Sequence, residues 1–132
     1  MSDADLILSS GPVRLRAMND ARGEHPAKQW YNDLEPRYQA RVLSRLDNVR
    51  NSIESGRPTV ALGVMKESKV GLLEFRVTLP GGTPPHLRMF VIRRGLTLWA
   101  ATGITKKSNK IKGQDWREAE RLAVGWVASH SA

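Results

Sequence analysis

Two residues of opposite charge, Glu74 and Arg76, stand in a mostly apolar stretch of the chain, residues 72–79. They are two positions apart, so in a β-strand both side chains point to the same face of the sheet. Arg88 opens the next strand that the pattern predicts, and Lys106 and Lys107 follow a third. A group of Arg and Lys side chains of this kind binds a phosphate and stabilises the charge that builds on a phosphate under attack.

Cleavage of RNA suits such a group, because the neighbouring 2′-hydroxyl can serve as the nucleophile. The protein then needs only a base, positive charge and an acid. Glu74 is the candidate base, and His86 is a candidate acid. Two plainer interpretations stay open. Glu74 can be an ordinary cross-strand ion-pair partner of Arg76 or Arg88, and His86 can be a solvated loop histidine, which is the commoner role.

The positive charge of the chain is concentrated in one segment. Its 132 residues include 21 Lys and Arg against 13 Asp and Glu, which gives a net charge of +8. Between Phe75 and Gln114 there is no acidic residue, and the eight basic residues there account for the whole excess. They are Arg76, Arg88, Arg93, Arg94, Lys106, Lys107, Lys110 and Lys112. This segregation favours a surface that binds a polyanion, nucleic acid above all; the alternative is a basic protein without a specific partner.

Several classes of protein are excluded by what the sequence lacks. It has no cysteine and only three scattered histidines, which argues against disulfides and against thiolate or structural zinc sites. No apolar run approaches the ~20 residues of a membrane helix, and the acidic start does not resemble a signal peptide. Neither a phosphate-binding glycine loop nor a nucleophile-elbow serine occurs. We therefore expect a cytoplasmic protein with no metal, no cofactor and no membrane contact.

The N-terminal half predicts a tail, a strand and two helices. Residues 1–11 are expected to be a flexible tail, and residues 12–132 a single domain. Residues 13–18 alternate as a short strand does. Pro26 and Pro36 each suit the first turn of a helix, and the second helix carries an apolar stripe and ends at Gly56. Its arginine-rich opposite face is most simply a solvated face.

The C-terminal half predicts three antiparallel strands and a last helix. The strands cover residues 72–79, 87–93 and 96–104, the last of them apolar on both faces and so central in the sheet. A basic loop, residues 105–113, follows, and Asp115 can cap a helix with Glu118 three residues on. Trp116 and Trp126 are expected in the core stripe of that helix. The prediction is an α+β fold, strand-helix-helix-three antiparallel strands-helix, with the helices packed on one face of the sheet.

Three short motifs occur in order along these strands: Leu72-Leu-Glu-Phe-Arg76, Arg88-Met-Phe90 and Ile104-Thr-Lys-Lys-Ser108. In this order and context the chain resembles the RelE/ParE toxin superfamily, in its HigB-like, phage-associated branch. The resemblance covers about residues 13–128 and implies a RelE-like fold and the toxic half of a type II toxin–antitoxin pair. The RelE and HigB branches cut messenger RNA in the ribosomal A site without a metal, whereas the ParE branch inhibits DNA gyrase.

The resemblance also implies roles for particular residues. Those that match the catalytic positions are Glu74, Arg76, Arg88 and Lys107. The further residues predicted to bind RNA are Lys66, which the branch often has ahead of the first of these strands, and Lys106, next to Lys107. The concentration of positive charge adds Arg93, Arg94, Lys110 and Lys112 to them.

We therefore predict a toxin that is a metal-independent, ribosome-dependent mRNA endonuclease. Its expected partners are the ribosome, messenger RNA and a cognate antitoxin protein that covers the basic surface or displaces the last helix. Two alternatives remain. One is a ParE-like, non-enzymatic gyrase inhibitor, against which the basic strand cluster speaks, and the other is a basic RNA- or ribosome-binding module that does not cleave.

Overall fold

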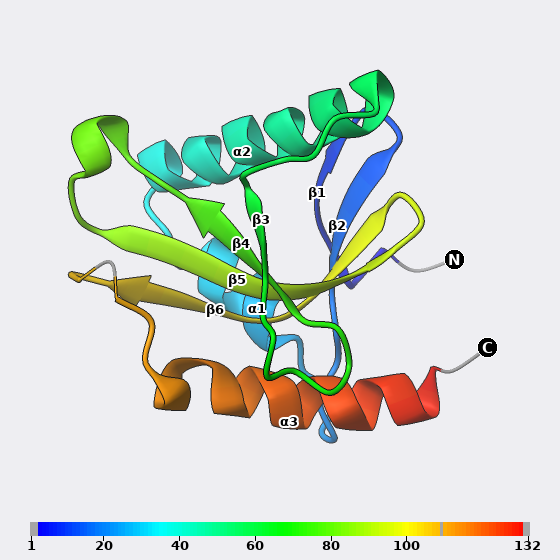
Figure 1. The fold of residues 1–132 in the computed structure, drawn as a ribbon. Coiled ribbons are helices and arrows are strands. Elements are labelled where there is room, and N and C mark those ends of the chain that lie inside the picture. Colours follow the sequence, from blue (N-terminus) through cyan, green and yellow to red (C-terminus); the bar gives the residue numbers. More distant parts are fainter. Residues whose placement is uncertain (1–2, 109, 131–132) are drawn as a thin grey trace.

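The helices of this protein cover both faces of one mixed β-sheet (Figure 1). The computed structural model describes residues 3–108 and 110–130. Within them the elements are β1 (Leu6–Ser10), β2 (Val13–Ala17), α1 (Pro26–Asn32), α2 (Pro36–Ser55), β3 (Leu62–Val64), β4 (Leu73–Val77), a short 3₁₀ turn (Pro80–Gly82), β5 (His86–Arg94), β6 (Thr97–Lys106) and α3 (Gly113–Ser129). The fold class is α+β, as predicted.

The strands lie in the order β1-β2-β6-β5-β4-β3. β2 and β6 run parallel, and the other neighbouring pairs are antiparallel. The predicted meander of three antiparallel strands is confirmed as β4–β5–β6. Because β4 and β5 lie next to each other, the charged residues of both strands can meet on one face of the sheet.

The prediction that all helices pack on one face of the sheet is wrong. α1 and α2 cover one face, where their buried side chains meet those of β2, β4, β5 and β6. α3 covers the opposite face, with Ala119, Ala123 and Trp126 buried in one cluster with Phe90 and Ile92 of β5. The physical reason lies in β5, whose first seven residues are all buried. A strand whose residues are buried on both sides needs a cover on both faces.

The N-terminal segment contains a strand that the sequence did not reveal. Residues 6–10 form β1, which pairs antiparallel with β2, so the predicted tail over residues 1–11 is wrong for this part. Ser10 of β1 donates a hydrogen bond to the Asp47 carboxylate of α2, and Arg16 of β2 binds Asp5 at 2.7 Å. β3 was also missed, since three residues are too few to display an alternating pattern.

The limits of the two long helices follow from their end residues. α2 ends at Gly56, whose φ of 69° is left-handed, as the sequence predicted. α3 begins two residues before Asp115, with Lys112 as the residue at its N-cap. The Asp115 carboxylate accepts a hydrogen bond from the Lys112 backbone N–H at 2.7 Å, so Asp115 acts from within the first turn. The predicted capping box of Asp115 with Glu118 is therefore wrong by one helical turn.

Candidate functional site

Three charged side chains meet where β4 and β5 pair, on the face of the sheet that α3 covers. Nε of Arg88 donates to Oε1 of Glu74 at 2.8 Å, and Nε of Arg76 donates to the same oxygen at 3.2 Å. The side chains of Glu74 and Arg88 are 11% and 4% exposed, whereas that of Arg76 is 45% exposed. A buried ion pair thus lies beneath an open guanidinium group. We call these three residues the Glu74 cluster.

The strand register brings the Glu74 cluster together. Arg76 lies opposite Arg88, and Glu74 lies opposite Phe90. Like charges directly opposite each other repel, and the Glu74 carboxylate between the two arginines offsets that repulsion. The expectation that these residues share one face is confirmed. The interpretation of Glu74 as an ion-pair partner of Arg76 or Arg88 is also confirmed, and the structure shows both pairs.

The Glu74 carboxylate uses its two oxygens differently. Both guanidinium groups bind Oε1. Among the described residues, none donates a hydrogen bond to Oε2. Oε2 is therefore the carboxylate oxygen that the arginines of the cluster leave available as an acceptor, next to the Arg76 group that can hold an anion.

The position of the Arg76 guanidinium depends on β3. In the pairing of β3 with β4, Gly63 lies opposite Glu74. A Cβ atom at position 63 would stand 2.4 Å from Nη2 of Arg76 and 2.7 Å from its Cζ, so the guanidinium occupies space that only a glycine leaves open. Arg45 of α2 donates from Nε to the backbone carbonyl of Arg76 at 2.9 Å. Gly63 was not among the predicted site residues, because β3 is too short to display the pattern of a strand and so to mark a glycine within one.

Lys106 is held within the protein. Its ammonium group donates to the Asp115 carboxylate and, at 2.9 Å, to the Lys110 carbonyl, and its side chain is 17% exposed. Burial raises the pKa of Asp115, but hydrogen bonds from Lys106 and Lys112, together with their charges, lower it more. The net pKa of Asp115 lies below the ordinary aspartate value. Lys106 therefore joins the end of β6 to the start of α3, which is a structural role for a residue predicted to bind RNA.

The loop that Lys106 fixes presents the remaining lysines. Lys107, Lys110 and Lys112 are exposed. The loop leaves the sheet beside the start of β5, because Lys106 lies opposite His86. His86 itself is only 8% exposed, so its interpretation as a solvated loop histidine is wrong. It shares a face with Arg88, two positions further along β5.

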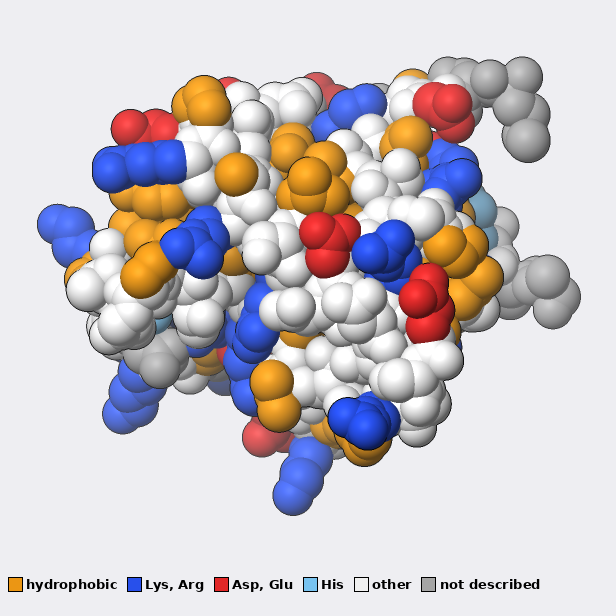
Figure 2. Space-filling view, turned by 90° about the horizontal axis from the view of Figure 1, so that it is seen from above, with side chains coloured by type: hydrophobic (Ala, Val, Ile, Leu, Met, Phe, Trp, Pro, Cys, Tyr) orange, Lys and Arg blue, Asp and Glu red, His pale blue; other side chains and the backbone are white. Residues whose placement is uncertain are grey.

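The other predicted RNA-binding residues lie apart from the Glu74 cluster. Arg94, at the far end of β5, sits 4.7 Å from the centre of the Trp126 ring and donates to the His130 carbonyl. Arg93 lines a depression beside α2, and Lys66 is exposed between β3 and β4. Figure 2 looks onto the α2 side, where Lys and Arg side chains are spread over a largely uncharged surface. The eight basic residues between Phe75 and Gln114 therefore do not form one surface.

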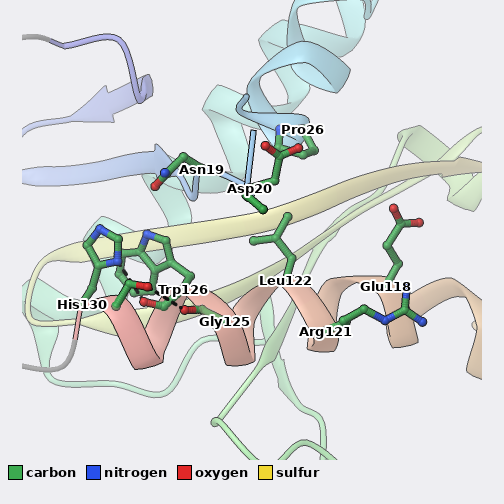
Figure 3. A pocket seen from close by; sticks show the side chains of 11 residues that line it. Asn19, Asp20, Pro26, Glu118, Arg121, Leu122, Gly125, Trp126 and His130 are labelled. Carbon is green, nitrogen blue, oxygen red and sulfur yellow. Dashed lines mark hydrogen bonds between the residues drawn. The ribbon is translucent and has the colours of Figure 1, made fainter. Parts of the chain in front are cut away.

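A cavity of about 550 Å³ lies between α3 and the connection from β2 to α1 (Figure 3). Leu122 and Trp126 are apolar parts of its lining, and Figure 3 shows Leu122 and Glu118 pointing from α3 towards the segment that carries Asp20. Asp20, Glu118 and Arg121 bring charges of both signs to its lining. Asp20 also accepts hydrogen bonds from backbone N–H groups of its own turn. This mixed lining has no preference for phosphate, and it includes none of the predicted site residues.

In the described part of the chain, no three His, Asp or Glu side chains are grouped so that they could hold a metal ion. None of the described helices combines the length and the apolar character needed to cross a membrane. A scan against protein-family models and a search of the curated proteins each gave no match for this chain.

Proposed function

We propose that the chain is the toxin of a bacterial type II toxin–antitoxin pair and cuts messenger RNA on the ribosome without a metal ion. The observation that carries this proposal is the Glu74 cluster, in which a carboxylate oxygen stands next to a half-exposed guanidinium. A base beside a phosphate-binding cation is what attack by a 2′-hydroxyl requires. The order of elements from β2 to α3 supports it, since apart from β3 it is the order that the resemblance to the RelE/ParE superfamily implies.

The proposed reaction uses Glu74 as the base and Arg76 as the phosphate-binding cation. Glu74 takes the proton of the 2′-hydroxyl, and the freed oxygen bonds to the adjacent phosphorus. Arg76 stabilises the negative charge that builds on the phosphoryl oxygens. The bond from phosphorus to the 5′-oxygen then breaks, and that oxygen takes up a proton from Lys107 or from water. The products are a 2′,3′-cyclic phosphate and a 5′-hydroxyl end.

Arg88 acts in this mechanism as a positioning residue. At 4% side-chain exposure its guanidinium is not open to a substrate phosphate. Its Nε binds Glu74, and its Nη1 donates to the Leu87 carbonyl at 3.0 Å. Arg88 therefore fixes the carboxylate from below, while Arg76 meets the substrate from above.

The test is to induce the gene in a bacterium and map the ends of its messenger RNA. The wild-type chain should stop growth and leave discrete, codon-linked cuts. Glu74→Gln, Arg76→Ala and Lys107→Ala should remove the cuts while the circular dichroism spectrum stays native. Arg22→Ala is the matched control, because Arg22 is exposed in the turn before α1, and it should cut like the wild type.

Three outcomes would overturn the proposal. Growth arrest with damaged DNA and intact transcripts would identify a gyrase inhibitor. Binding of RNA or ribosomes without any cuts would identify a binding module. Cuts that persist in Glu74→Gln and Arg76→Ala would remove the Glu74 cluster from the reaction.

A further inference from the structure

A groove runs between the C-terminal half of α2 and the segment that leads from α2 to β3. Its volume is about 370 Å³. It is lined by Arg45, Asn48, Asn51, Ser52, Ser55, Arg57, Pro58, Thr59 and Val60, and we call it the α2 groove. A second depression of about 350 Å³ shares Arg57 and Thr59 with it and adds Arg93. The two together form one continuous surface.

This surface has hydrogen-bond donors and positive charge, and none of the described residues that line it is acidic. Asn48, Asn51 and Arg57 are exposed, and their side chains have no hydrogen-bond or ion-pair partner among the described residues. The three arginines come from separate places, namely α2 for Arg45, the connecting segment for Arg57 and β5 for Arg93. They are therefore brought together by the fold and are not a charged run along one helix. Arginine and amide N–H groups are the usual partners of phosphodiester oxygens.

The α2 groove adjoins the Glu74 cluster through two contacts at the edge of the sheet. Arg45, which lines the groove, donates to the backbone carbonyl of Arg76 at 2.9 Å. The connecting segment leads into Ala61, whose carbonyl accepts a hydrogen bond from the Arg76 backbone N–H at 2.9 Å. β3 is the edge strand, so a strand of RNA that leaves Arg76 around this edge meets the groove next.

We infer that the α2 groove binds the sugar–phosphate backbone of the same RNA strand that the Glu74 cluster engages, as a second contact outside the reacting nucleotides. The inference takes the identity of the ligand, RNA, from the proposed function. It adds a separate requirement, because the affinity must then depend on the length of the strand. Backbone contacts of this kind raise the affinity and its salt dependence without reading the sequence.

The experiment measures fluorescence anisotropy of two 2′-O-methylated oligoribonucleotides, which cannot be cleaved. The short one reaches only the Glu74 cluster, and the long one extends beyond it. Arg57→Gln should bind the long strand about three- to tenfold more weakly, with a salt slope smaller by about 0.7, the value for one lost contact to a single strand. Its affinity for the short strand should equal that of the wild type. Asn51→Asp, which places a carboxylate in the groove, should act in the same direction.

Arg22→Gln is the matched control, since it removes one exposed arginine outside the groove. If Arg22→Gln and Arg57→Gln lose the same affinity for the long strand, or if Arg57→Gln loses as much affinity for the short strand as for the long one, the effect comes from overall positive charge. Either result would overturn the inference. The inference would also be overturned if polyglutamate, a polyanion without phosphates, displaced the long strand as effectively as unlabelled RNA. Weaker sedimentation of Arg57→Gln with ribosomes, with oligonucleotide binding unchanged, would assign the groove to ribosomal RNA and also overturn it.

The two proposals fail separately. Because these strands cannot be cleaved, the binding result does not depend on cleavage. If the wild-type chain binds the long strand through Arg57 but leaves messenger RNA intact, the proposed endonuclease activity is wrong and the inference about the groove stands. If the wild type and Arg57→Gln cut messenger RNA equally well, and each oligonucleotide binds the two proteins with equal affinity, the endonuclease activity stands and the inference about the groove is wrong.

Discussion

The Glu74 cluster and the α2 groove both contain arginine side chains, but within the described part of the chain those of the cluster are paired with a carboxylate and that of Arg57 in the groove is not. In the cluster, Glu74 binds both Arg76 and Arg88, and at the end of β6 Lys106 binds Asp115 of α3 in the same way. In the groove, the Arg57 side chain has no partner among the described residues. The first region is stabilised by its own ion pairs and offers a ligand only one half-exposed guanidinium. The second lacks a counter-charge among the described residues that line it, so we expect a ligand to supply one.

This contrast distinguishes two kinds of basic residue, those that are buried and paired within the fold and those that are exposed and unpaired. A net charge of +8 counts buried and exposed cations alike. Buried cations are tied to carboxylates by the fold, and their removal affects stability. Exposed, unpaired cations contribute little to stability and act on binding through the surrounding field. Substitutions in the two regions should therefore differ in which property they change.

Arg88→Ala should have the largest effect, because it breaks the paired state. Among the described residues, it leaves the buried Glu74 carboxylate with the half-exposed Arg76 as its one ion-pair partner. Removing one member of a buried ion pair typically costs about 3–5 kcal/mol. We expect the free energy of unfolding, measured by urea denaturation, to fall by that amount.

The double variant Glu74→Leu/Arg88→Met distinguishes the ion pair from the packing around it. Two apolar side chains of similar size leave no buried unpaired charge, since the Arg76 side chain that loses its partner is half-exposed, so most of the lost stability should return. If the double variant is as unstable as Arg88→Ala, packing of the long side chain is the cause. The contrast between paired and unpaired charge would then not explain the stability of the cluster.

Gly63→Ala should give the next largest effect, on activity and not on stability. The new Cβ atom meets the far end of the flexible Arg76 side chain, which can move at little cost to the fold. A displacement of about 1 Å in a positioned group can lower a rate by up to about 100-fold. We expect messenger-RNA cleavage to fall about 10- to 100-fold, while the free energy of unfolding changes by less than about 1 kcal/mol.

Gly125→Ala is the matched control for this substitution. Nothing lies within 4 Å of a Cβ atom built at Gly125, which is an exposed position of α3, so cleavage should not change. In an Arg76→Ala background, Gly63→Ala should have no further effect on the affinity for the short, uncleavable strand, because its target is gone. An additive loss in the double variant would mean that Gly63 acts through something other than Arg76. Loss of the hydrogen-bonded Arg76 Nε–H signal by nuclear magnetic resonance gives the same test without an assay of activity.

The parts of the fold that could be predicted are those that depend on local sequence patterns. The meander β4–β5–β6 and the end of α2 at Gly56 rest on local patterns, a period of two and a left-handed glycine, and the sequence revealed both. β1 has consecutive apolar residues in place of alternation, and β3 has only three residues, so neither carried a pattern. The face on which α3 packs depends on the whole sheet, so no local pattern predicted it. The seven buried residues at the start of β5 show that both faces of the sheet have to be covered.

The candidate site was predictable to the same degree. A period of two and neighbouring strands were enough to bring Glu74 together with its arginines. The same period shows why the basic segment could not form one surface, since Arg93 lies towards α2 and Arg94 towards α3. The role of Gly63 depends on how β3 pairs with β4, and that of Asp115 on where α3 begins, which composition and spacing do not encode.

Asp115→Asn should have a smaller effect on stability than Arg88→Ala. It removes the charge that binds Lys106 but keeps an oxygen for the Lys112 backbone N–H, so a loss of about 1–2 kcal/mol is expected at pH 7. The pKa of Asp115 is lowered in the folded protein, so its contribution is complete above the unfolded value, about 3.9, and is lost as the pH falls through the folded value. Urea denaturation of both proteins should show a difference that shrinks below about pH 4. A difference independent of pH would mean that shape, not charge, matters at this position.

Arg57→Gln should change stability least, and it sets the other end of the contrast. Its side chain has no partner among the described residues, and it lines the groove together with Arg45. We expect the free energy of unfolding to stay within about 0.5 kcal/mol of the wild type. At low salt it should rise slightly, because a neighbour of like charge is gone, whereas Asp115→Asn lowers it. Saturating long, uncleavable RNA should raise the melting temperature of the wild type more than that of the variant, since a ligand stabilises the folded state in proportion to the logarithm of its excess over Kd. Loss of stability in the absence of RNA would mean that Arg57 is tied into the fold as Arg88 is, and the two regions would no longer differ in kind.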